Sequence, residues 1–161
     1  MLYSKDCSSK MKKYIIFGVA LILVMVILVV ATKIDMNNKK IDVTSFELIY
    51  SNGYSANANG RYIYKNNTIT YKKSGYSENK LRTTYVDNTF KEKLEKIIKE
   101  YDVLSWDGFN SSDDLALDGD SFTLTIVNNG KTIKAHGYMR YPKYYSIFEN
   151  RIIDLFDEYK F

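Results

Sequence analysis

The stretch SFTLTIVNNGKTIKAHGY, residues 121–138, decides the fold. Apolar and polar residues alternate on both sides of Asn129-Gly130, and Asn-Gly between alternating apolar residues is a strong signal for a two-residue hairpin turn. The segment therefore predicts an antiparallel hairpin with one apolar and one polar face. The predicted pairs on the apolar face are Ile126–Ile133, Leu124–Ala135 and Phe122–Gly137.

A second hairpin is predicted upstream in RYIYKNNTITYKK, residues 61–73. Asn66-Asn67 suits a two-residue turn because asparagine tolerates positive φ. That turn would place Tyr64 opposite Ile69. Alternation of apolar residues predicts further strands over 43–50 and 81–86.

Two amphipathic helices are predicted from apolar residues at helical spacing. The first begins at a capping box, Thr89 to Glu92, and the second opens near Pro142. We therefore expect an α+β fold, with an antiparallel sheet of about five or six strands and both helices on one face. The two apolar stripes are Phe90, Leu94, Ile97, Ile98 and Tyr101, and Phe148, Ile152, Leu155, Phe156 and Tyr159.

Residues 14–31, YIIFGVALILVMVILVVA, are eighteen consecutive uncharged residues. As a helix they would extend about 27 Å, close to the hydrocarbon thickness of a bilayer. We predict a single transmembrane helix, although cleavage of a secretory signal after Ala31 is an alternative. Four lysines in the tail 1–13 favour a cytoplasmic N-terminus. The remaining chain would be a tether, 32–42, and an extracytoplasmic domain, 43–161.

The charge distribution argues against nucleic acid as a partner. The net charge is +4, but residues 34–161 hold eighteen basic and eighteen acidic side chains. A nucleic-acid binder concentrates its positive charge on the binding module. The only cysteine, Cys7, would lie on the cytoplasmic side, so the outer domain could form no internal disulfide.

Residues 106–122, WDGFNSSDDLALDGDSF, carry an unusual density of aspartates. The spacing fails the EF-hand pattern, although an irregular calcium site could use Asp113, Asp114, Asp118 and Asp120. Paired carboxylates for sugar hydrolysis are a third reading. We favour a structural loop in which Trp106, Phe109, Leu115 and Leu117 enter the core and the aspartates accept backbone N–H groups.

Catalytic signatures are missing from the sequence. His136, the only histidine, is expected on the polar face of the hairpin opposite Thr123, away from any nucleophile or metal ligands. No nucleophile elbow, P-loop, zinc-protease or dinucleotide motif occurs. We predict no enzyme activity and no cofactor.

Tyrosine is the most unusual component of the composition, with fifteen residues. Strand propensity explains some of them. Tyr138, Tyr141, Tyr144 and Tyr145, with Arg140, could instead form a partner-binding surface, because tyrosine supplies large amphipathic contact area at low entropic cost.

The segments WDGF (106–109), LDG (117–119), SFTLTI (121–126) and NNGKTIKAHGY (128–138), followed by a proline before the last helix, resemble a small domain of unknown function. That domain recurs in exported and membrane-anchored proteins of low-GC Gram-positive bacteria. The resemblance covers about residues 43–161. It implies an α+β architecture and an envelope location, and it carries no catalytic or binding residues.

These features predict a single-pass membrane protein whose outer domain binds a protein or another component of the bacterial cell envelope. Its contact with the lipid bilayer would be through residues 14–31. An immunity or inhibitor protein against an envelope-acting toxin or hydrolase is an alternative. An envelope enzyme is a further one, for which a pocket with carboxylates of perturbed pKa would be the sign.

Overall fold

The computed structural model describes residues 18–19, 21–26, 40–51, 53, 59–72, 81–113, 115 and 118–159. The chain divides into two compact units, Met1–Lys40 and Ile41–Phe161. In the first unit, residues 18–19 and 21–26 are helical. Among the described residues, no helix is long and apolar enough to cross a membrane. The predicted span 14–31 lies largely outside the described residues, as do the tail 1–13 and residues 32–39 of the tether.

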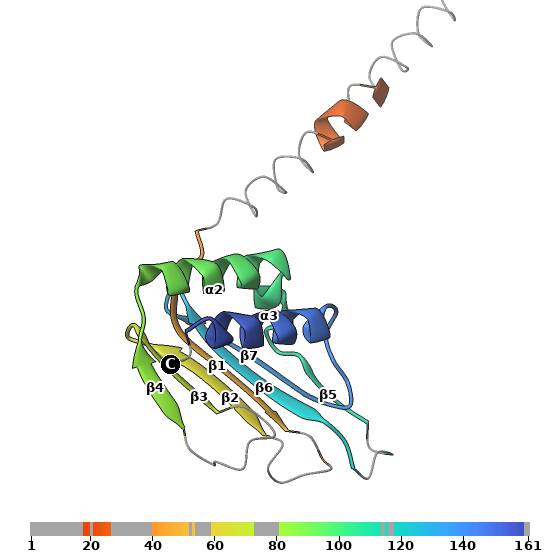
Figure 1. The fold of residues 1–161 in the computed structure, drawn as a ribbon. Coiled ribbons are helices and arrows are strands. Elements are labelled where there is room, and N and C mark those ends of the chain that lie inside the picture. Colours follow the sequence, from red (N-terminus) through yellow and green to blue (C-terminus); the bar gives the residue numbers. More distant parts are fainter. Residues whose placement is uncertain are drawn as a thin grey trace, which may run out of the picture. The chain divides into compact units, whose positions relative to one another are not determined.

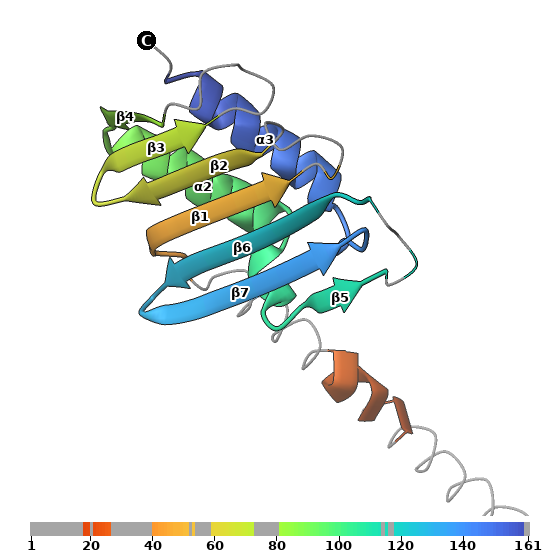
Figure 2. The same cartoon turned by 90° about the horizontal axis from the view of Figure 1, so that it is seen from below.

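The second unit is built on a seven-stranded sheet with the strand order β4-β3-β2-β1-β6-β7-β5 (Figures 1 and 2). Two helices lie together on one face of this sheet (Figures 1 and 2). The α+β class and the placement of both helices on one face were therefore predicted correctly. The strands are β1 (Val43–Ser51), β2 (Gly60–Lys65), β3 (Thr68–Lys72), β4 (Arg82–Tyr85), β5 (Asn110–Ser112), β6 (Ser121–Asn128) and β7 (Lys131–Tyr138), and the helices are α2 (Asn88–Glu100), the short 3-10 helix η1 (Val103–Trp106) and α3 (Tyr145–Asp157).

The sheet is mixed, which corrects the predicted antiparallel sheet of five or six strands. The added strand, β5, runs parallel to β7, with Asn110 paired to His136. The Gly108 N–H donates to Lys134 O at 2.9 Å, and the His136 N–H donates to Phe109 O at 2.8 Å. A strand of sequence NSS has no apolar alternation, so its sequence gives no periodic signal.

Both predicted hairpins have the predicted register. Asn66 and Asn67 have φ values of 50° and 55°, and Asn129 and Gly130 have values of 50° and 75°. Positive φ at both central residues is the geometry of a type I′ turn, which matches the twist of the flanking strands. The pairs observed are Tyr64–Ile69 and Tyr62–Tyr71 in the first hairpin, and Ile126–Ile133, Leu124–Ala135 and Phe122–Gly137 in the second.

The helix boundaries differ from the predicted ones at their N-termini. Asp87, not Thr89, is the N-cap of α2, and its carboxylate accepts the backbone N–H groups of Thr89 and Phe90 at 2.9 and 3.3 Å. Aspartate is as good an N-cap as serine or threonine, so the capping-box match was two residues late. Helix α3 begins at Tyr145. The Tyr145 N–H donates to Pro142 O at 3.2 Å, so a short turn separates the proline from the helix.

The compact unit also begins earlier than predicted. Ile41 packs against the core, and the Asp42 N–H donates to Asn128 Oδ1 at 2.8 Å. The Asp42 carboxylate pairs with Lys91 on α2. Residues 41 and 42 therefore belong to the folded unit and not to a tether.

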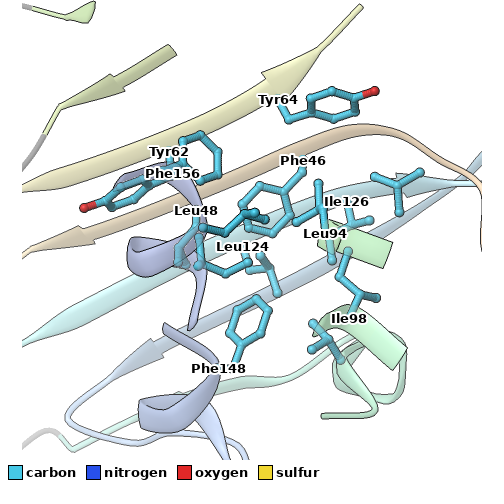
Figure 3. Close-up of a cluster of buried hydrophobic side chains, with 14 of the residues drawn as sticks. Phe46, Leu48, Tyr62, Tyr64, Leu94, Ile98, Leu124, Ile126, Phe148 and Phe156 are labelled. Carbon is cyan, nitrogen blue, oxygen red and sulfur yellow. The ribbon is translucent and has the colours of Figure 1, made fainter. Parts of the chain in front are cut away.

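The core lies between the helices and the covered face of the sheet (Figure 3). Phe46, Leu48, Leu124 and Ile126 on the central strands are fully buried. Phe156 of α3 packs edge-on against Tyr62 and Phe90, with both ring centroids 5.1 Å away. This central packing anchors α3, and with it the segment that enters the helix from β7.

Candidate functional site

The aspartate-rich segment is anchored by its aromatic residues, as predicted. Trp106 is buried and packs edge-on against Phe148 at 5.1 Å, and Phe109 stacks on Phe122 at 6.2 Å. The Asp107 carboxylate pairs with Lys131 at 2.8 Å and accepts the Lys134 N–H at 3.2 Å. The hydrogen bond from Lys131, and then that from Lys134, lower the pKa of Asp107.

The prediction that Leu115 enters the core is wrong, because its side chain is 93% exposed. The Asp113 carboxylate accepts the Leu115 N–H at 3.3 Å, an Asx turn of the predicted kind. This turn follows directly on β5 and directs Leu115 outward. Leu117 lies outside the described residues.

The three described members of the predicted calcium set have different surroundings. Asp113 forms an ion pair with Arg140 at 3.2 Å, and Asp120 lies where β6 begins. Asp118 is exposed, and Asp114 is outside the described residues. No group of three potential ligands meets around one point in the described part of the chain. A calcium site at these aspartates stays a prediction.

His136 lies on the uncovered face of β7 opposite Thr123, as expected from the register. Its Nδ1 lies 3.2 Å from Thr123 Oγ1. A shallow depression of about 390 Å³ includes His136, Lys134 and Phe109. Thr123 also lines this depression, so its hydroxyl and the His136 imidazole lie side by side there as exposed groups.

A larger cleft of about 530 Å³ lies where β1 ends, β6 begins and α3 begins. These three element ends meet at the same end of the sheet (Figure 2). The antiparallel pairing of β1 with β6 brings Ser51 opposite Ser121, and both serines line the cleft. The lining residues are Tyr50, Ser51, Asp120, Ser121, Tyr141, Pro142, Tyr144, Tyr145, Ser146 and Glu149.

Three members of the predicted tyrosine surface line this cleft: Tyr141, Tyr144 and Tyr145. Tyr141 and Tyr144 are 41% and 50% exposed, whereas Tyr145 is 5% exposed and forms a wall. Tyr138 and Arg140 are not among the lining residues. A partner surface formed by all five residues stays a prediction.

The sequence analysis missed Tyr50 and Glu149 as lining residues. Glu149 follows Tyr145 by four positions, so both lie on one side of a helix. A carboxylate on the edge of an apolar stripe could have been noticed from the sequence. Tyr50 gave no such signal, because strand alternation alone assigns it to the sheet face.

Tyr141 and Tyr145 form one wall of the cleft, the tyrosine wall, which is held in place by stacking. The ring centroids of Tyr141 and Tyr145 lie 5.0 Å apart, and those of Phe122 and Tyr145 lie 4.2 Å apart. The Tyr141 hydroxyl donates to Asp120 O at 3.2 Å. Tyr144 has a φ of 68°, a left-handed conformation that is costly for a residue with a Cβ. The cleft is thus a formed feature with local backbone strain.

The electrostatics of the cleft are dominated by Glu149 and Asp120. Burial raises the pKa of Glu149, and the charge of Asp120 raises it further. Burial, followed by the charge of Glu149, raises the pKa of Tyr145. The Tyr145 hydroxyl lies near the Glu149 carboxyl group, but it is buried and meets hydrogen-bond geometry with no described residue.

Replacing Glu149 with glutamine is expected to stabilise the fold at neutral pH. Because its pKa is raised in the folded state, Glu149 contributes stability that is present below its ordinary pKa of 4.5 and lost as pH rises through the folded value. Glu149→Gln should therefore unfold at higher urea than wild type at pH 7, with a smaller difference at pH 4. A variant less stable than wild type at pH 7 would contradict this electrostatic account.

No known family model matches the chain, and none of the curated proteins compared with it matches either. The residues and geometry of the cleft are therefore the basis for assigning a function.

Proposed function

We propose that this chain is a membrane-anchored binding protein of the bacterial cell envelope. Residues 14–31 would be its single transmembrane helix, because eighteen uncharged residues can span the hydrocarbon of a bilayer. The preceding lysines favour a cytoplasmic N-terminus and an extracytoplasmic domain. The partner would be a protein or another envelope component.

The observation that carries the binding assignment is the cleft at the start of α3. It presents Tyr141 and Tyr144 to solvent beside a formed cavity of about 530 Å³. Binding sites combine concave shape, aromatic lining and a few convergent polar groups. Phe122 and Tyr145 both stack on the Tyr141 ring, so little ordering of that ring is needed on binding.

A photo-crosslinking amino acid at Tyr144 tests this proposal in native membranes. It should capture one specific partner, whereas the same amino acid at Thr132, on the uncovered face of β7, should not. Thr132 is exposed and lies near the opposite end of the sheet. Equal products from both positions, or none from Tyr144, would overturn the assignment of the cleft.

One observation favours a second candidate, an envelope hydrolase. Glu149, whose pKa is raised, and Asp120 share the cleft, and two carboxylates with different environments can serve as acid and base. Hydrolysis of cell-wall glycan by the purified chain, abolished by both Glu149→Gln and Asp120→Asn, would establish this activity. The binding function predicts that the wild-type chain leaves the glycan intact.

A further inference from the structure

The lining of the cleft at the start of α3 combines four tyrosines with two carboxylates. Tyr50, Tyr141, Tyr144 and Tyr145 supply the rings, and Asp120 and Glu149 supply negative charge. No lysine, arginine or histidine belongs to the described lining. The faces of aromatic rings carry negative potential and attract cations, most strongly where water is excluded. The whole lining therefore favours a positively charged group.

The cleft also holds polar groups that are poorly satisfied within the described residues. The Tyr145 hydroxyl is buried in a residue that is 5% exposed, and it lies near the Glu149 carboxyl group without meeting full hydrogen-bond geometry with any described residue. Burial and repulsion by Asp120 disfavour the charged form of Glu149 and outweigh the opposing effect of Tyr145. Such groups carry a desolvation cost that a hydrogen-bond donor with positive charge would offset.

We propose that this cleft binds the ammonium or guanidinium group of a lysine or arginine side chain presented by a partner protein. The inference rests on the proposed binding function and names the chemistry of the partner. The charged end would lie between Asp120 and Glu149, and the apolar stem of the side chain would pass over the tyrosine rings. An inorganic cation fits less well, because the described residues offer no group of three ligands.

Two cationic side chains of the chain itself lie close by, and both are engaged. The Lys143 ammonium lies 4.6 Å from the centroid of the Tyr144 ring. Arg140 pairs with Asp113. Lys143 occupies one face of Tyr144 and opposes an incoming positive charge, so its removal should strengthen binding. This effect is opposite in sign to that of removing a cleft carboxylate.

The test uses the full chain in zwitterionic detergent micelles, titrated with a blocked tetralysine peptide and followed by NMR. Shifts should be concentrated at Tyr141, Tyr144 and Glu149. Glu149→Gln and Asp120→Asn should each weaken binding about tenfold, as expected for loss of a charge-assisted contact. Lys143→Ala should strengthen it. Glu92→Gln, which removes an exposed carboxylate from α2, is the matched control and should change nothing.

Three outcomes would overturn the inference. The first is equal binding of the peptide with acetylated lysines, and the second is equal weakening by Glu92→Gln and Glu149→Gln. The third is binding of free spermine at the same residues with the affinity of the peptide, which would point to a free amine. If the partner crosslinked at Tyr144 is still captured in Glu149→Gln, the proposed binding function stands and the cationic assignment fails. A cooperative unfolding transition in micelles at pH 7, with a midpoint at or above that of wild type, would verify that Glu149→Gln is folded.

Discussion

Phe156→Ala is expected to destabilise the domain by about 3–5 kcal/mol, the usual cost of deleting a buried phenylalanine ring. Phe156 is fully buried, and its ring contacts those of Phe46, Tyr62, Tyr71 and Phe90. These neighbours come from β1, β2, β3 and α2, so the cavity would lie where helices and sheet meet. A domain of this size has a free energy of unfolding of about 5–15 kcal/mol, so the substitution would remove a large share of its stability.

Urea unfolding of the full chain would measure this loss, with fluorescence of the single tryptophan, Trp106, as the signal. Trp106 packs against Tyr145 and Phe148, whereas the deleted ring packs against Phe46, Tyr62, Tyr71 and Phe90, so the fluorescence of Trp106 reports global unfolding. Phe156→Leu is the control, and it should cost less than about 1.5 kcal/mol because most of the volume is retained. Similar midpoints for Phe156→Ala and wild type would show that α3 is not anchored as described.

Gly137→Ala is expected to destabilise the domain by about 3 kcal/mol, although it adds only one methyl group. A Cβ at this position would lie 2.0 Å from the backbone oxygen of Arg140 and 2.5 Å from Cε1 of Phe122. The first of these atoms belongs to the backbone of the turn after β7. The turn would have to move, and it leads directly into the tyrosine wall of the cleft.

Two variants separate the backbone clash from the ring clash. Phe122→Leu in the Gly137→Ala background should not restore stability, because the Arg140 oxygen remains in place. Thr132→Ala, on the uncovered face of the same strand, should change stability by less than about 0.5 kcal/mol. Full rescue by Phe122→Leu would contradict the proposed role of the turn. The midpoint of thermal unfolding for the four proteins supplies the comparison.

The parts of the fold that could be predicted are those fixed by local periodicity and turn chemistry. Asn66-Asn67 and Asn129-Gly130 determined the strand registers, because a two-residue type I′ turn leaves one pairing. Strand β5 was missed because it is set by hydrogen bonds to β7 from a distant segment. Leu115 was misplaced because one Asx turn reverses an alternation that looks like strand.

The cleft was less predictable than the fold, because its residues come from three separate places in the chain. Proximity in sequence grouped Tyr141, Tyr144 and Tyr145, which all line the cleft. Arg140, grouped with them, pairs with Asp113 and is not among the lining residues. Tyr50 joins the cleft only through the pairing of β1 with β6, which sequence alone does not specify.

The central claim is that residues 14–31 hold the chain in a membrane with the binding domain outside the cell. The single cysteine makes this measurable with a membrane-impermeant maleimide on intact cells. Thr132→Cys in a Cys7→Ser background should be labelled in intact cells and remain in the membrane fraction after carbonate extraction. Wild-type Cys7 should be labelled only after lysis. Labelling of Cys7 in intact cells, or recovery of the full-length chain in the soluble cytosolic fraction, would contradict the account.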